Sequence, residues 1–132
     1  MQKFIIFISL FVTVISLRNC SGNPYSFKEP IDEIESIEII SAENSLEFTV
    51  IKTLSDTEKE DFLEQFKGIK FYDYAGDPPA LYGYAIKINY QSGIYETICH
   101  FAAEYVEYGV IQFRWRSCNE GEFNELLNTF LE

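Results

Sequence analysis

Alternating apolar and polar positions predict two β-strands early in the chain. In the first strand, Ile37 and Ile39 fall on one side of an extended chain and Glu38 falls on the other. The second strand, LEFTVIKTL at 46–54, alternates in the same way. The polar gap SAEN at 41–44 is typical of a hairpin connection, so we expect the two strands to pair.

Two other stretches repeat their apolar residues at helical spacing. Ser55 followed three positions later by Glu58 forms a capping-box pattern, and it predicts a helix that ends at Gly68. Near the C-terminus, Asn119 predicts a second helix cap. The residues after that cap place five large apolar side chains on one helical face: Phe123, Leu126, Leu127, Phe130 and Leu131. Such a face must pack against a sheet.

Further alternating segments complete the expected fold. After the first helix they predict strands at 69–74, 82–90, 93–101 and 109–117. The predicted order is therefore ββα-ββββ-α. Short hairpin connections favour antiparallel pairing, so we expect an α+β fold with an antiparallel sheet of about five to six strands and both helices packed on one face.

The N-terminus predicts export. Lys3 is followed by the continuous apolar run FIIFISLFVTVISL at 4–17, which carries no charge. This run is too short for a comfortable membrane span and is typical of the apolar core of a secretory signal.

The end of the apolar run leaves two cleavage sites open. The segment LRNCSG at 17–22 resembles the lipid-attachment box of bacterial lipoproteins, which makes Cys20 the candidate lipid attachment site. Arg18 and Asn19 depart from that box, where small residues are usual. The alternative is ordinary signal-peptidase cleavage after Gly22.

The length of 132 residues suits one small domain after the signal. We expect a signal peptide at 1–19, with cleavage as late as residue 22, then a linker at 20–30 and a single α+β domain at 31–132.

The composition indicates a packed core under an acidic surface. Hydrophobic residues make up 47% of the chain, and 21 acidic against 10 basic residues give a formal net charge of -11. Such a charge disfavours binding to a phosphate backbone, which lysine and arginine must neutralise. We therefore expect no nucleic-acid partner, and a membrane contact only through an N-terminal lipid.

The sequence contains no recognisable catalytic or metal-binding pattern. His100 is the single histidine and follows Cys99, but adjacent side chains in a strand point to opposite faces and cannot share a proton. One histidine and separated cysteines do not make a zinc set, and the sequence has no calcium-binding loop. We expect no catalytic residues, no metal, no cofactor and no enzymatic activity.

The cysteines carry a further expectation. Cys20 is either acylated or removed with the signal, which leaves Cys99 and Cys118 as a pair. In an exported chain an even number of cysteines indicates a disulfide, so this pair is the candidate. The alternative is two buried free thiols, which are common in protein cores.

A tyrosine-rich loop is the first candidate binding surface. Residues 71–84 read FYDYAGDPPALYGY, and GDPP at 76–79 is turn chemistry that makes a rigid loop. Four tyrosines flank this turn: Tyr72, Tyr74, Tyr82 and Tyr84. Some of the rings must pack at the rim of the core, and the others, held on a stiff loop, would lose little entropy on binding a partner.

The sheet face away from the helices is the second candidate. On the strands assigned above it carries charged residues: Lys87, Glu96, His100, Arg114 and Arg116. One interpretation is a solvated, salt-bridged face of little energetic value. The other is a recognition surface, in which Lys87, Arg114 and Arg116 join the four tyrosines, since arginine and tyrosine anchor protein interfaces.

From GDPPALYGYAIKINYQSGIYE at 76–96 through CNEGEFNELLNTFLE at 118–132, the chain resembles small exported or lipoprotein-like bacterial domains of unknown function. The resemblance implies an envelope or secreted domain and carries no catalytic motif. We expect a non-catalytic exported binding domain for an unknown protein partner. The alternative is an inhibitor or immunity-type protein that acts on an enzyme through its acidic surface.

Overall fold

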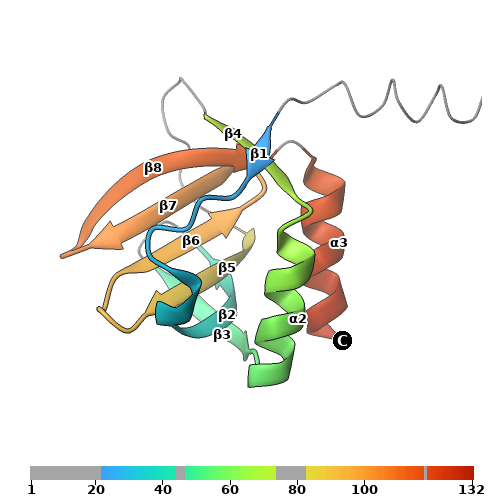
Figure 1. Cartoon of the computed structure of the whole chain (residues 1–132), viewed down its shortest axis with the longest axis horizontal. Helices are drawn as coiled ribbons and strands as arrows, with labels where there is room; N and C mark the ends of the chain where they lie inside the picture. The colour runs from blue at the N-terminus through green and yellow to red at the C-terminus, as the bar shows by residue number, and fades with distance from the viewer. Residues whose placement is uncertain (1–21, 44–46, 74–82, 118) are drawn as a thin grey trace, which may run out of the picture.

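The computed structural model describes residues 22–43, 47–73, 83–117 and 119–132, which form one sheet with two helices on one face (Figure 1). Along the chain the elements are β1 (Asn23–Pro24), the 3-10 helix η1 (Ile31–Glu33), β2 (Ile34–Ala42), β3 (Phe48–Thr53), α2 (Asp56–Phe66), β4 (Lys70–Asp73), β5 (Gly83–Tyr90), β6 (Tyr95–Cys99), β7 (Ala102–Glu107), β8 (Val110–Ser117) and α3 (Glu120–Leu131).

The sheet is antiparallel throughout, with its strands in the order β1-β4-β8-β7-β6-β5-β2-β3. The expected α+β class and the placement of both helices on one face are confirmed. In the described part of the chain the sheet has 8 strands, and it exceeds the expected five to six by β1 and β7. Both are weak signals in the sequence, because β1 contains two residues and β7 begins with small alanines.

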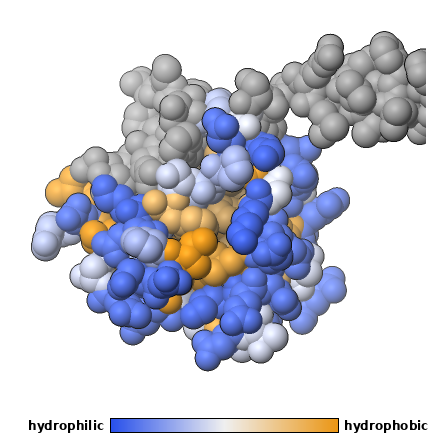
Figure 2. All heavy atoms as spheres, viewed as in Figure 1, coloured by the Kyte–Doolittle hydropathy of each residue, from blue (hydrophilic) through white to orange (hydrophobic). Residues whose placement is uncertain are grey.

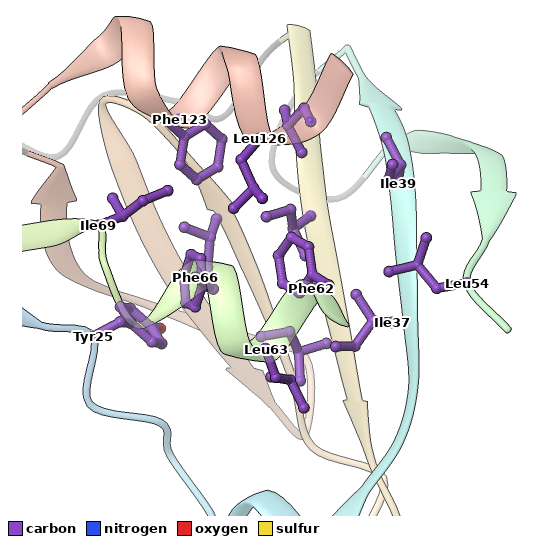
Figure 3. Close-up of a cluster of buried hydrophobic side chains, with 14 of the residues drawn as sticks. Tyr25, Ile37, Ile39, Leu54, Phe62, Leu63, Phe66, Ile69, Phe123 and Leu126 are labelled. Carbon is purple, nitrogen blue, oxygen red and sulfur yellow. The ribbon is translucent and has the colours of Figure 1, made fainter. Parts of the chain in front are cut away.

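The apolar alternation of the strands builds the helix-covered face. Ile37 of β2 pairs with Ile88 of β5, and Ile39 pairs with Ile86, so that four isoleucines form a block beneath the helices. The close-up in Figure 3 shows α2 and α3 directing their apolar side chains into this block. The α3 residues buried there are Phe123, Leu126, Leu127 and Phe130, as their spacing predicts.

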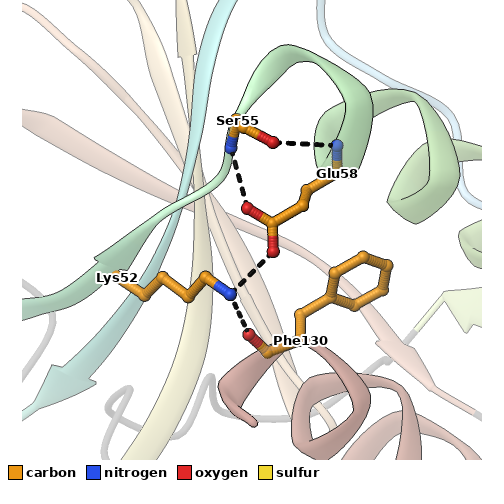
Figure 4. A network of polar contacts seen from close by, with 4 residues as sticks. All are labelled: Lys52, Ser55, Glu58 and Phe130. Atoms are coloured by element: carbon orange, nitrogen blue, oxygen red, sulfur yellow. Dashed lines mark hydrogen bonds and ion pairs between the residues drawn. The ribbon is translucent and has the colours of Figure 1, made fainter.

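A single lysine joins the strand before α2 to both helices (Figure 4). Lys52 Nζ lies 2.7 Å from Glu58 Oε2 and donates a hydrogen bond of 2.6 Å to the Phe130 carbonyl. Glu58 also closes the predicted capping box with Ser55. The hydrogen bond from Lys52 is the main reason that the pKa of Glu58 is lowered. Because the last turn of α3 contains no basic residue, Lys52 supplies the cation that favours its free carbonyls.

The segment expected to be a linker is part of the fold from Asn23 on. Tyr25 is buried in the main core, where its ring meets Phe66 and Phe71. Its hydroxyl donates a 2.6 Å hydrogen bond to Glu96 Oε1 on β6. The prediction of a linker at 20–30 is therefore wrong for this stretch, because a short polar sequence can be held by a buried partner that lies far away in the chain.

Glu96 is a fully buried carboxylate with three donors. Besides Tyr25, the Tyr90 hydroxyl and the Lys28 main-chain N–H donate to its Oε2, the latter at 3.0 Å. Burial and the neighbouring carboxylate raise the pKa of Tyr90, so its hydroxyl remains a donor. This cluster, which we call the Glu96 clasp, fastens residues 25–28 to the sheet.

The predicted signal peptide and Cys20 lie outside the described residues. Neither of the helices described has the length and apolar composition needed to cross a membrane.

Candidate functional site

The structure separates the predicted tyrosines. Tyr72 lies on β4 and Tyr84 on β5, and both are exposed. The order β4-β8-β7-β6-β5 places four strand spacings between them, roughly 19 Å at the usual separation of neighbouring strands. Tyr74 and Tyr82 lie outside the described residues. Tyr72 and Tyr84 therefore do not belong to one compact tyrosine surface.

The predicted cations also do not gather with Tyr84. Lys87 lies three residues after Tyr84 on the same strand and so points to the other face of the sheet. There its Nζ sits 4.4 Å from the ring centre of Phe48 and 4.6 Å from that of Tyr95, which places it in two cation–π contacts. Arg114 and Arg116 belong to β8, three strands from β5, and their side chains lie outside the described part of the chain.

Of the residues predicted on the helix-free face, Lys87 lies there and Glu96 does not. Glu96, expected on this face, is opposite Ile88 and points to the helix side. Buried on the helix-free face are Thr97 and Glu104, which pair across β6 and β7. A second apolar cluster also covers part of it: Ile40, Ala42, Ala85, Cys99, Phe101 and Ala102. The sequence therefore predicted the correct face for Lys87 on β5 and the wrong face for Glu96 on β6.

The structure does not support the predicted disulfide. Cys99 is a buried free thiol at the end of β6, and Cys118 lies outside the described residues. Burial raises the pKa of the Cys99 thiol to about 12. A thiol with such a pKa is almost entirely protonated at neutral pH and is a poor nucleophile.

His100 lies in the turn between β6 and β7 rather than within a strand. Its Nε2 is 3.5 Å from Glu120 Oε1 at the start of α3. Its ring packs edge-on against the ring of Phe101, with 4.8 Å between the two ring centres. The neighbouring Cys99 is the buried thiol described above. Among the described residues, no three histidine, cysteine or acidic side chains are grouped as metal ligands.

A pocket of about 350 Å³ opens beside His100, between the first residues of β5 and the exposed flank of α3. We call it the Tyr84 pocket. Its lining consists of Gly83, Tyr84, His100, Phe101, Asn124, Leu127 and Asn128. Tyr84 is 59% exposed, whereas Phe101 and Leu127 are buried and form an apolar floor. Gly83 and Tyr84, the last two residues of the tyrosine-rich segment, are also the first two residues of β5.

The polar lining of the Tyr84 pocket is almost uncharged. Asn124 and Asn128 are one helical turn apart, so their amides lie side by side at about 6 Å along the helix. Each amide offers both a donor and an acceptor. Two such groups beside an exposed aromatic ring can hold a neutral polar chain, such as a peptide backbone, by paired hydrogen bonds.

Sequence reasoning missed an exposed aromatic residue at the β7–β8 turn. Glu107 pairs with Val110, so the hairpin loop contains only Tyr108 and Gly109. Both have positive φ, 53° and 80°. This is the type I′ pattern, in which asparagine is strongly preferred before glycine and a bulky residue costs about 1–3 kcal/mol of strain. Tyr108 is nevertheless 97% exposed. The signal in the sequence is EYGV at 107–110, an aromatic residue where turn chemistry favours asparagine.

Comparisons with models of known protein families, with characterised proteins and with solved structures find no match to this chain.

Proposed function

We propose that this chain is an exported, non-catalytic binding domain, secreted or held at the cell surface by a lipid on Cys20. Its partner is a protein that presents an extended, uncharged segment to the Tyr84 pocket. The observation that carries the proposal is the pairing of two adjacent amides with the exposed Tyr84 ring over an apolar floor.

The chemistry of the pocket supports binding rather than catalysis. His100 approaches the carboxylate of Glu120, and its neighbour Cys99 is a buried thiol with a raised pKa. A nucleophile would need a base within hydrogen-bond reach and a way to ionise. Paired amides and a tyrosine instead supply hydrogen bonds and contact area at low entropic cost, as they do in binding loops.

Alanine at Asn124 or Asn128 is expected to weaken peptide binding at least tenfold without unfolding the domain. The physical reason is that each substitution removes a donor and an acceptor from the pocket, while alanine is the residue that helices tolerate best. The probe is a displayed library of random peptides, from which binders of the full chain are selected and titrated by fluorescence anisotropy.

The matched control is Gln65→Ala, which removes an exposed amide from α2 and leaves the Tyr84 pocket intact. This variant should bind the selected peptides as the unmodified protein does. Tyr84→Ala should behave like the asparagine variants. Failure to enrich any peptide, or unchanged binding by Asn124→Ala and Tyr84→Ala, would contradict the proposal.

Export is tested by the intact mass of the protein recovered from the cells that produce it. We expect either a chain that begins at Cys20 and carries the added mass of a lipid or a bare chain that begins at Asn23. The first result places the domain at a membrane surface, and the second places it in the medium. A chain that retains residues 1–19 would contradict export.

The acidic surface favours a second candidate, an inhibitor or immunity-type protein that binds a basic enzyme. The formal charge is -11, and hydrophilic residues cover most of the face seen in Figure 2. An association driven by this charge should weaken steeply between low and physiological salt, because screening acts most on exposed charges. Binding that is insensitive to salt would argue against this candidate.

A further inference from the structure

We infer that the tip of the β7–β8 hairpin is a second docking surface, which inserts Tyr108 into an apolar pocket of a basic protein. The inference goes beyond the Tyr84 pocket and does not depend on it. It starts from a residue whose conformation is unfavourable and whose side chain contributes little to the fold.

Tyr108 occupies the first loop position of a two-residue turn with φ of 53°. Positive φ is uncommon for residues other than glycine, asparagine and aspartate, and a bulky side chain there is an outlier. Strain of this kind is ordinarily offset by packing of the side chain. Here the ring is 97% exposed, so burial within the domain does not offset it. Strained residues that the fold does not explain gather at functional sites.

The surroundings of Tyr108 form a preshaped surface. A pocket of about 430 Å³ lies between the β7–β8 turn and the neighbouring β5–β6 turn. Its lining consists of Ser92, Gly93, Ile94, Tyr95, Val106, Glu107, Tyr108 and Gly109. The ring of Tyr95 is held in place by an edge-on contact with Phe48 and a cation–π contact with Lys87 Nζ. The adjacent Val110 is also exposed. An exposed aromatic ring on a stiff turn loses little entropy on binding.

The charge around the tip selects the class of partner. Glu107 lines the pocket, and Glu29 lies beside it, where its Oε1 accepts a 3.0 Å hydrogen bond from Ser92 Oγ. Among the described side chains no lysine or arginine lines the pocket, and the whole chain carries a formal charge of -11. Like charges disfavour a second copy of this chain, an anionic membrane and a nucleic acid. The complementary partner is a protein with basic residues around an apolar pocket.

The two surfaces are physically separate. The Tyr84 pocket begins at Gly83, the first residue of β5, whereas the tip pocket begins at Ser92, just beyond Tyr90, the last residue of that strand. Eight residues of extended chain span roughly 25 Å. Substitutions at one surface therefore leave the other unchanged.

The test is Tyr108→Asn in the full chain, which is expected to raise stability and to remove binding. Asparagine suits this turn position, so the thermal midpoint should rise by about 2–5 °C. To obtain the partner, a benzophenone amino acid is placed at position 108 and, as a control, at the exposed Glu60 of α2, and the producing cells are irradiated. The protein that crosslinks at 108 alone is then purified and titrated against each variant.

The inference is supported if that protein is basic, binds the unmodified domain in a salt-dependent way, and loses at least tenfold in affinity to Tyr108→Asn but not to Asn124→Ala. It is overturned if position 108 gives no adduct above the Glu60 control, or if the adduct is a lipid or a second copy of this chain. Binding by Tyr108→Asn within twofold of the unmodified domain, or a thermal midpoint that falls, also overturns it. If Asn124→Ala loses peptide binding and Tyr108→Asn keeps its partner, the proposal for the Tyr84 pocket holds and the inference about Tyr108 fails.

Discussion

Glu96→Ala is expected to lower the free energy of unfolding by about 3–5 kcal/mol, because two buried hydroxyls and a partly buried main-chain N–H lose their acceptor at once. The Tyr25 and Tyr90 hydroxyls and the Lys28 main-chain N–H all converge on this carboxylate, which is 0% exposed. Each donor left without a partner costs about 1–3 kcal/mol, and a small domain has only about 5–15 kcal/mol in total. The variant should therefore be marginal at physiological temperature.

The matched control is Glu96→Gln, which keeps the size of the side chain and one carbonyl acceptor. It should lose about 1–2 kcal/mol, since a hydroxyl can reorient toward an amide but the charge-assisted bonds are gone. Urea unfolding followed by circular dichroism measures both variants. A loss below about 1 kcal/mol in Glu96→Ala would mean that water replaces the carboxylate and that the Glu96 clasp does not hold the fold together.

Phe66→Ala should destabilise the domain by a similar amount, about 3–5 kcal/mol. The Phe66 ring is the centre of the aromatic core: Phe62, Tyr25, Phe71 and Phe27 lie around it with ring centres 5.3 to 5.8 Å away. Alanine would leave a cavity that cannot close, because its walls belong to α2, β4 and the N-terminal segment at the same time.

A conservative substitution at the same position tests whether the loss of stability comes from the cavity. Phe66→Leu fills much of the space, so about 1–1.5 kcal/mol is expected. Phe48→Ala, on the helix-free face, removes a half-buried ring and should cost about 1–2 kcal/mol. Equal losses for Phe66→Ala and Phe48→Ala in urea unfolding would contradict the central place given to Phe66.

The fold class was predictable because it rests on local periodicity. The spacing of Ile37 and Ile39 predicts a strand face, and Ser55 with Glu58 predicts the start of a helix. The structure confirms both. Strand order could not be predicted in this way, because it depends on which strand edges pair in the folded chain. That order separates Tyr72 from Tyr84, and nothing in the spacing of the two residues indicates it.

The polar residues show where the prediction ends. Glu96 has the sequence neighbours of a surface residue, yet it is buried, because its partners Tyr25 and Lys28 lie about seventy positions away. The Tyr84 pocket was half predictable: Tyr84 stood out by its composition, whereas Asn124 and Asn128 looked like ordinary positions on a solvated helix. The unusual position of Tyr108 is visible in the sequence, because a two-residue turn before glycine favours asparagine and this chain has tyrosine there.

If Cys20 carries the proposed lipid, the Glu96 clasp would also limit how far the domain can move from that anchor. The expected linker placed ten or so residues between a lipid and the fold, but β1 begins at Asn23, three residues after Cys20. Three residues reach at most about 10 Å. A lipid on Cys20 would therefore keep the domain against the bilayer with the β1 and β4 edge nearest the lipid, and would restrict which directions its other surfaces can face. Tyr25, Tyr90 and Glu96 would then determine the orientation of the whole domain as well as its stability.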